Sequence, residues 1–598
     1  MRCAGALVAA LVAVAGACPL GAAPLEGIPG SIATDSLLMP TETFVLTRDD
    51  LACYNVHTLD DVLRLLPGVV LWREGPPGSY GGFSIDARSS RGLNLLVNGV
   101  PVVDPYTLES MARFIPLSRL ARVEVLYSGS PHYTCGSSSN GAVNVVLEEG
   151  GREAPATEVN FTYGGSKQRV RRAWFATPRA HIGGVLAYDE YLQDAAELYA
   201  ASPSVKLGQY DMRAVLGELD IRSTEGDEIV VRLERFEDWY RGTALSASEE
   251  LRSAGFGSEI TYRRGGFSGS LRERGLTLTR AAGSMENLSS GASLRMARSL
   301  GPLAVRAFAS AERSEFDNRL WGVTFDPSCS RVEGGALLGA RIGSGVTVRG
   351  GAFGGDHDVV GRYGGAEFAV AREWSPRFTQ SVMIARRVRI PSARELFQPL
   401  VAYTNEGLPD STVGSRLLSP EITDEVSLGA RAPHLTIDAF ARNERSRIIL
   451  VGKGQRIYRA EGSGSVAGAR GRYAGTARLL GLDCSLAVGA EAFAKRSGVT
   501  SGIPSYRLTG ELGISRGIFG GAERASLSLN SEVVGRRSWE GTELDAYHVH
   551  GIAASLTVMG ARVSFEYRNV LDAEYETVPG YLMPRRYFLI GIFWELFD

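Results

Sequence analysis

The feature that most constrains this chain is a pattern of short alternating segments, which runs from residue 155 to the C-terminus. In residues 217–221 and 229–233, a small or apolar residue stands at every second position, and residues 223–227 between them have the composition of a turn. Arg232 occupies one of the alternate positions, so one face is apolar and the other carries charge. Because side chains in a strand point alternately to opposite faces, this pattern predicts antiparallel strands joined by turns.

The length of this region favours an all-β barrel that spans a membrane. Residues 155–598 divide into about 22 units of about 20 residues, and a membrane strand needs roughly 10 residues, with a similar length for its connections. After residue 23, the chain has no stretch of about 20 apolar residues that could form a transmembrane helix. The last segment, Tyr587–Asp598, is rich in aromatic residues and resembles the closing strand that the barrel assembly machinery reads in outer-membrane proteins. A soluble sheet would seldom end in such a strand, because an exposed apolar edge aggregates.

The N-terminus predicts export. One basic residue, Arg2, precedes an apolar stretch that ends near Cys18, and small residues follow as far as Ala23. Residues 1–23 therefore have the pattern of a signal peptide, and their apolar core is too short to span a membrane. Cleavage after Ala17 is the alternative, which would leave Cys18 first and open to lipid modification. Residues 24–40 would form a periplasmic leader.

Residues 41–150 have a different pattern, which predicts a small α/β domain. A helix is expected over Thr58–Leu66, with Thr58 as N-cap, acidic residues in its first turn and Pro67-Gly68 as its stop. Short apolar runs surround this helix, at Thr43–Thr47, Val69–Trp72, Leu93–Val97, Arg122–Tyr127 and Ala142–Leu147. The lumen of a barrel with about 22 strands is too wide for side chains to fill, so we expect this domain to be a plug inside it.

Composition and motifs give no sign of nucleic-acid binding or of an enzyme. The 64 basic residues are balanced by 66 acidic ones, which is not the charge of a nucleic-acid binder. His548 and His550 share a strand face, and His357 lies between two aspartates, but lumen, turn or interface positions explain them better than a metal site. No nucleophile motif or phosphate-binding loop is present, so no catalytic residues, metal ligands or cofactors are predicted.

Three separated groups of motifs resemble those of TonB-dependent outer-membrane receptors. The plug motifs are Leu59–Val69, Leu95–Val100, Val123–Leu126 and Gly141–Val146. The barrel motifs are Arg389–Phe397 with Leu418–Glu421 in the middle, and Asn569–Tyr575 with Gly580-Tyr581 and Pro584–Tyr587 near the end. The resemblance implies a plugged barrel of about 22 strands in the bacterial outer membrane that works with TonB and its inner-membrane energising complex. From residue types alone, we expect Asn569 and Asp572 to stabilise a periplasmic turn.

The family resemblance also implies an energy-coupling segment, the TonB box, just after the signal peptide. Asp35-Ser36-Leu37-Leu38-Met39 is the candidate that we favour, and an unstructured leader is the alternative. Glu42–Thr47 fits the box pattern better, but its position predicts the first plug strand. We expect the partner to add a strand to the box and pull on the plug.

One departure from the family pattern concerns the contact between plug and barrel. The family usually shows Ile-Arg-Gly after the first plug strands, whereas this chain has Ser84-Ile85-Asp86-Ala87-Arg88, with the arginine displaced by two positions. The resemblance implies that such an arginine forms ion pairs with the barrel. We therefore predict that Arg88 takes this role, with Glu395 and Glu421 as its partners.

The predicted function is active import of a scarce solute such as siderophore-bound iron or cobalamin. Cargo would bind between the extracellular loops and the apex of the plug, where Tyr80, Asp104 and Tyr106 are the candidate contacts because aromatic and polar residues on loops suit ligand capture. We expect a monomer embedded in outer-membrane lipid. Two alternatives remain: a plugged barrel uncoupled from TonB that acts as a passive porin or surface protein, and a soluble secreted β-rich binding protein or hydrolase.

Overall fold

The structure is a computed structural model that describes residues 39–596, apart from a set of short internal segments. These segments are residues 40–41, 52–55, 57, 74–80, 89–91, 105, 108–114, 116, 118, 135–139, 149–154, 179–180, 195–208, 225, 242–249, 281–282, 321–322, 344, 399–403, 406–407, 410, 452–454, 498–501, 519–522 and 540–541. The predicted signal peptide lies outside the described residues. Among the described residues, no helix is long and apolar enough to cross a membrane.

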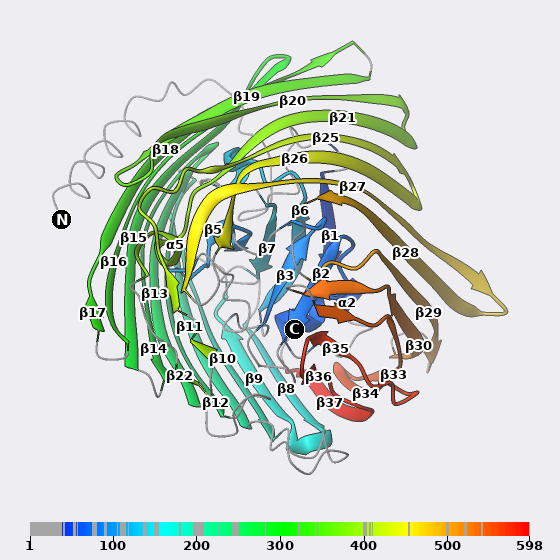
Figure 1. The fold of residues 1–598 in the computed structure, drawn as a ribbon. Helices are drawn as coiled ribbons and strands as arrows, with labels where there is room; N and C mark the ends of the chain where they lie inside the picture. Colours follow the sequence, from blue (N-terminus) through cyan, green and yellow to red (C-terminus); the bar gives the residue numbers. More distant parts are fainter. Residues whose placement is uncertain are drawn as a thin grey trace.

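The described strands form a closed antiparallel barrel around a small N-terminal domain (Figure 1). In the described part of the chain, 22 long strands make the wall, and β37 closes the ring by pairing with β8. Their bounds are β8 (Ala156–Gly164), β9 (Arg169–Ala176), β10 (Ile182–Asp194), β11 (Gln209–Arg222), β12 (Asp227–Arg241), β13 (Glu250–Arg264), β14 (Phe267–Arg280), β15 (Gly283–Leu300), β16 (Leu303–Leu320), β18 (Ser328–Ile342), β19 (Val346–His357), β20 (Gly361–Ser375), β21 (Phe378–Arg389), β25 (Glu421–Ala432), β26 (Leu435–Val451), β27 (Gln455–Leu479), β28 (Leu482–Ser497), β29 (Tyr506–Ile518), β30 (Glu523–Val534), β33 (Tyr547–Val558), β34 (Ala561–Arg568) and β37 (Tyr587–Glu595). The predicted fold class is confirmed.

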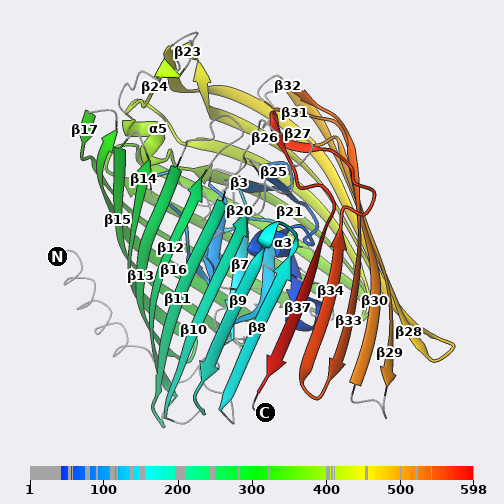
Figure 2. The same cartoon turned by 90° about the horizontal axis from the view of Figure 1, so that it is seen from below.

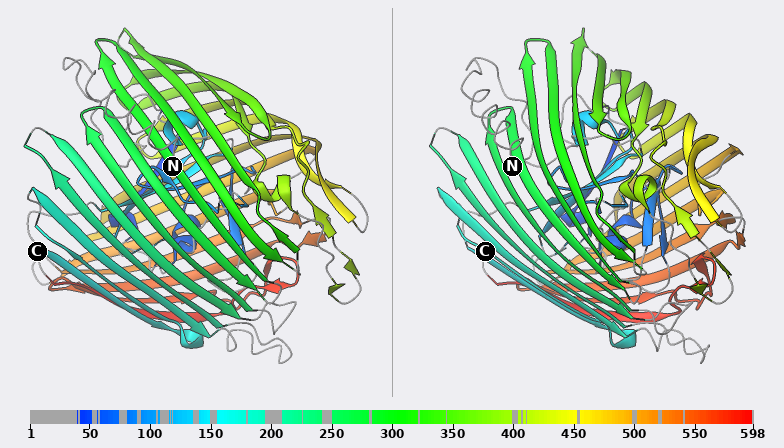
Figure 3. Two further views of the ribbon diagram at one scale, coloured as in Figure 1. Left: turned by 90° about the vertical axis from the view of Figure 1, so that its left-hand side faces the viewer. Right: turned by 60° about the vertical axis from the view of Figure 1, so that its left-hand side comes forward.

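Short elements lie in the connections at one end of the barrel. They are β17 (Val323–Phe325), α5 (Ala393–Phe397), β22 (Thr404–Asn405), β23 (Leu408–Pro409), β24 (Ser411–Val413), β31 (Arg537–Trp539), β32 (Thr542–Leu544), β35 (Glu576–Val578) and β36 (Tyr581–Leu582), and a 3-10 turn, η2 (Gly165–Lys167), links β8 to β9. Figure 2 shows α5, β23 and β24 at the end opposite to the C-terminus. The wall strands are strongly tilted, as closure of a barrel requires (Figure 3).

The wall has the polarity of a protein whose solvent is lipid. Leu233 on β12 faces outward and is 59% exposed, whereas its neighbour Arg232 faces the lumen and is 6% exposed. Glu218 and Asp220 on β11 are likewise buried on the inner face, while Leu219 between them is exposed. An apolar outer face with charges on the inner face suits the hydrocarbon core of a membrane, where a closed sheet leaves no backbone group unpaired. This arrangement excludes the soluble alternative.

The two ends of the barrel differ in the length of their connections. At one end the strands are joined by tight turns, such as Leu480-Gly481 and Met559-Gly560, in which both residues have positive φ, as a two-residue type I′ hairpin requires. The other end carries the long connections, including residues 390–420 and 569–586. Because short turns are periplasmic in such barrels, the long connections lie outside the cell.

Asn569 lies at this extracellular end, so the prediction that Asn569 and Asp572 stabilise a periplasmic turn was wrong about the side. Its side chain bridges the connection between β34 and β37, accepting from Ala573 N (2.8 Å) and donating to Ala573 O (2.7 Å). Asp572 accepts from the guanidinium of Arg585 in the same connection (2.9 Å). Residue type indicated a turn, but only the order of the strands shows at which end the turn lies.

The plug is a small mixed domain inside the barrel. Its main sheet has the order β1 (Thr43–Thr47), β6 (Leu120–Leu126), β7 (Ala142–Leu147), β4 (Asn94–Val97) and β5 (Val100–Pro101). A separate hairpin consists of β2 (Val69–Arg73) and β3 (Gly81–Ile85), and the short helices are α2 (Arg48–Leu51), α3 (Leu59–Leu63) and α4 (Pro131–Thr134). The valines of β6 and β7 are fully buried and form its core.

Helix α3 begins as predicted. The Thr58 side chain accepts from the backbone of Asp61, whose carboxylate accepts from the backbone of Thr58, so the two form a capping box. The regular helix ends at Leu63, three residues earlier than predicted, because residues 65 and 66 donate to carbonyls only three positions back. This tightened last turn directs the chain into β2, beside the barrel wall.

Candidate functional site

The N-terminal segment of the plug is fixed to the barrel wall close to its periplasmic end. Of the TonB-box candidate, Asp35, Ser36, Leu37 and Leu38 lie outside the described residues, and Met39 is buried against Ala369, Ala371 and Met383 of the wall. Three residues later, Glu42 accepts from the backbone of Met39 (2.7 Å) and binds Arg349 of β19 (Nη1–Oε2 2.5 Å). Glu42 directly precedes β1, so this ion pair lies at the start of the plug sheet.

Arg349 belongs to a buried charge cluster on the inner wall. Glu367 of β20 lies 3.3 Å from Arg349 and also binds Arg387 of β21. A buried ion pair is expensive to form, but removal of one partner costs more because it leaves an uncompensated charge. Among the described residues, Glu42 is the one carboxylate of this cluster that the plug supplies, so the cluster is a polar clasp between the plug and the wall.

A second clasp lies at the turn that follows β3. Arg88 binds Glu425 of β25 and donates to the carbonyl of Tyr127 (Nη1–O 2.6 Å). Two residues earlier, Asp86 binds Arg470 of β27, which also contacts Asp438 (3.1 Å). Asp86 stands where the family usually has arginine, and here the wall supplies the arginine instead.

The predicted partners of Arg88 bind a different arginine. Glu395 and Glu421 both contact Arg389 at the end of β21 (2.9 and 2.5 Å). Glu395 also completes a capping box with Ser392 at the start of α5. These local contacts occupy both carboxylates, and Glu425 is the residue that binds Arg88 in this structure.

Several wall side chains also hold the plug by its backbone. Arg507 donates to the carbonyls of Val69 (2.8 Å) and Arg64 (2.6 Å), and Glu491 accepts from Gly68 N (2.7 Å). Arg442 donates to the carbonyl of Asp86 (2.6 Å). When such an interface opens, its polar groups form hydrogen bonds with water instead. An interface of this kind is therefore easier to separate than a hydrophobic one.

Two of the three candidate ligand residues, Asp104 and Tyr106, lie at the extracellular end but are covered. Asp104 accepts from Tyr106 N (2.9 Å) and contacts Asn287 of the wall (3.3 Å). Tyr106 is buried against Phe316 (ring centroids 5.6 Å apart), and its carbonyl accepts from Arg394 N of α5 (2.8 Å). Tyr80 lies outside the described residues. The structure therefore brings Asp104 and Tyr106 together beneath the connection that carries α5.

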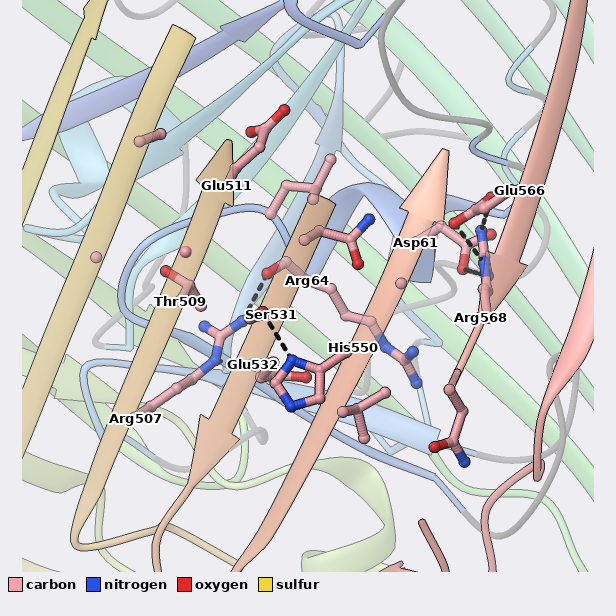
Figure 4. Close-up of a pocket in the computed structure, with 18 of the residues that line it drawn as sticks. Asp61, Arg64, Arg507, Thr509, Glu511, Ser531, Glu532, His550, Glu566 and Arg568 are labelled. Carbon is pink, nitrogen blue, oxygen red and sulfur yellow. Dashed lines mark hydrogen bonds and ion pairs between the residues drawn. The ribbon is translucent and has the colours of Figure 1, made fainter. Parts of the chain in front are cut away.

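A cavity of about 180 Å³ separates helix α3 from the wall strands β28 to β34 (Figure 4). Its charged lining residues are Asp61, Arg64, Arg73, Arg472, Arg507, Glu511, Glu532, Glu566 and Arg568. Arg568 binds both Asp61 (2.7 Å) and Glu566 (2.8 Å), and Arg507 binds Glu532 (2.8 Å). The cavity is a polar space beside the plug that pattern reasoning did not predict.

The histidine motifs do not form a metal centre. His548 and His550 alternate with residues of the inner face and lie on the outward face of β33, where His550 Nδ1 is 2.8 Å from Ser531 Oγ. His357 accepts from Val359 N (3.2 Å) in the turn after β19. Among the described residues, no group of three histidine, cysteine or acidic side chains is arranged to hold a metal ion.

Similarity to known proteins agrees with this geometry. Residues 37–143 match the family described as the TonB-dependent receptor plug domain. The siderophore receptor PirA from Acinetobacter baumannii has a TM-score of 0.77 at 12% identity, over 93% of this chain and 98% of that one. A mutant ferric enterobactin receptor PfeA from Pseudomonas aeruginosa, solved with enterobactin, has a TM-score of 0.77 at 14% identity, over 94% and 100%. The copper transporter OprC has a TM-score of 0.75 at 12% identity, over 93% and 99%. At these identities the likeness is one of fold.

Proposed function

Because the chain is a TonB-dependent receptor of the bacterial outer membrane, we propose that it actively imports a scarce metal chelate, with siderophore-bound iron as the first candidate. The observation that carries this proposal is a closed 22-stranded barrel, counted over the described strands, whose lumen holds a plug by polar clasps. A plug held in this way blocks passive flow and needs work to move. The family is one of transporters and not of enzymes, and its members interact with TonB.

Residues 35–39 are the segment that we assign to TonB. The partner would add a strand to this segment and pull towards the periplasm. Support comes from its position, because it directly precedes Glu42, the plug residue bound to Arg349. Release of this clasp would free β1, the edge strand of the plug sheet, before the clasp of Arg88 with Glu425 opens.

We assign cargo capture to the extracellular end. Tyr80 is a candidate direct contact, while Asp104 and Tyr106 would respond to cargo through α5, since Arg394 donates to the carbonyl of Tyr106. Glu395 and Glu421 support this connection by holding Arg389. The solved relatives include a siderophore receptor, a ferric enterobactin receptor and a copper transporter, so a ferric siderophore and copper both belong in a test panel, together with cobalamin.

The assembled receptor would be a monomer in outer-membrane lipid, folded by the barrel assembly machinery, which its aromatic last strand β37 suits. The alternative is a plugged barrel that is uncoupled from TonB. Deletion of residues 35–39 separates the two functions. Cells that express the deletion variant should bind ferric enterobactin, copper or cobalamin at the surface as the wild type does, but should no longer accumulate it. Equal accumulation by both would favour the uncoupled barrel.

A further inference from the structure

The cavity beside helix α3 contains more positive than negative side chains. Its lining includes five arginines and four carboxylates, and three of the carboxylates, Asp61, Glu532 and Glu566, are already bound by arginine. Two arginines form no ion pair with any described residue: Arg64 on the plug and Arg472 on β27. The guanidinium of Arg472 lies over the ring face of Phe44 (4.7 Å to the centroid). Carboxylates lie near both groups, Asp61 and Glu532 by Arg64 and Asp50 by Arg472, but none of the described ones is in direct contact with either guanidinium.

Arg64 is placed so that its side chain enters this space. It is the C-cap of α3, and its carbonyl accepts from Arg507, which fixes the backbone against the wall. In Figure 4 the guanidinium extends from the plug into the cavity, towards β33 and β34. Burial lowers the pKa of Arg64, but nearby acidic groups, with the Tyr575 hydroxyl foremost, raise it by more, so the side chain stays charged.

The wall opposite Arg64 provides room and neutral hydrogen-bonding groups. Gly489 and Gly551 line the cavity at this level, and the side chains of Thr509 and Asn530 extend over them. A methyl group at Gly489 would lie 2.4 Å from the Thr509 hydroxyl, and one at Gly551 would lie 2.4 Å from the Asn530 amide oxygen. A volume of about 180 Å³ holds several water molecules or one small charged group. Planar guanidinium groups bind carboxylate and phosphate with two parallel hydrogen bonds.

We propose that this cavity is an oxyanion site on the flank of the plug, in which Arg64 and Arg472 hold a carboxylate or phosphate group. This role rests on the proposed function. The cavity would hold an anionic cargo on its way from the extracellular surface to the periplasm, at a place separate from the covered residues Asp104 and Tyr106. Thr509 and Asn530 would supply the neutral contacts. Because Arg64 belongs to the plug and Arg472 to the wall, movement of the plug would separate the two groups and release the anion.

Titration calorimetry of the purified full chain, with citrate and inorganic phosphate as probes, tests the site. We expect saturable binding of one or both, weakened at least tenfold by Arg64→Gln and by Arg472→Gln, and weakened less by Arg64→Lys, which keeps the charge but loses the planar fork. Binding of citrate alone would point to a carboxylate of the cargo, and binding of phosphate alone would point to a phosphate. Arg235→Gln is the matched control, because Arg235 lies on the outward face and its side chain is 76% exposed.

Two results would overturn the site. One is the absence of saturable binding of either probe to the wild type, and the other is unchanged binding in Arg64→Gln and Arg472→Gln variants. Heat-modifiable migration in gels verifies that each variant is folded. Because Arg64 lies on the plug and Arg472 on the wall, the test still has a result if one of the two variants misfolds. The experiment uses no cells and no energy source, so its failure is distinguishable from a failure of TonB-dependent import.

Discussion

Replacement of Glu42 by glutamine should loosen the first strand of the plug without unfolding the barrel. Removal of one partner from a buried ion pair costs about 3–5 kcal/mol. Arg349 would keep Glu367 at 3.3 Å, so we take the lower end, about 3 kcal/mol. Since 1.4 kcal/mol is tenfold in an equilibrium, the detached state of β1 should become roughly 100-fold more populated.

Hydrogen–deuterium exchange of peptides that contain β1 measures this population directly. Glu42→Gln should speed exchange in β1 by about two orders of magnitude and leave β27 and β28 unchanged. In an Arg349→Met background the same substitution should have little further effect, because the two residues act as one unit. Glu237→Gln is the control, since Glu237 pairs with Arg235 on the outer face, with half or more of each side chain exposed. A change below threefold for Glu42→Gln would refute the clasp.

Three further substitutions test the packing of the plug. Glu425→Gln leaves buried Arg88 with the more distant carboxylate of Asp86 (4.0 Å) and should lower plug stability by about 3 kcal/mol, seen as faster trypsin cleavage of the plug. Gly68→Ala should lower the melting temperature more than Gly226→Ala: both glycines have positive φ, but a methyl group at Gly68 would meet an oxygen at 2.6 Å, whereas nothing lies within 4 Å at Gly226. Burial between two phenylalanines lowers the pKa of His132 to about 4, so the unfolded plug binds the extra proton. Stability should therefore fall by about 2 kcal/mol from pH 7 to pH 5, and His132→Phe should remove this loss, measured by hydrogen exchange at both pH values.

The elements of this fold could be predicted because they depend on local patterns. β1 and β7 have the bounds expected from their apolar runs, and the N-cap at Thr58 was predicted from a threonine followed by acidic residues. The barrel was predictable because alternation sets which face of each strand is apolar. The same alternation holds for β11 and β12, where Ile221 pairs with Ile229 across the turn.

The clasps could not be predicted, because their partners are far apart in the chain. Arg88 and Glu425 are separated by 337 positions, and no local pattern relates them. Glu395 shows the opposite case, since Ser392 three residues earlier is a helix-start signal that indicates local use of this carboxylate. The cavity beside α3 could not be predicted either, because it is lined by small residues of several wall strands that lie at one level of the barrel.

The most direct test of the account is accumulation of a radiolabelled ferric siderophore by paired cells that express this receptor with and without TonB. Surface binding should be equal in the two strains, because capture needs no energy. Accumulation inside the cells should occur only where TonB is present, and it should stop when residues 35–39 are deleted. Equal accumulation in both strains would contradict energy-coupled import and favour a passive plugged barrel.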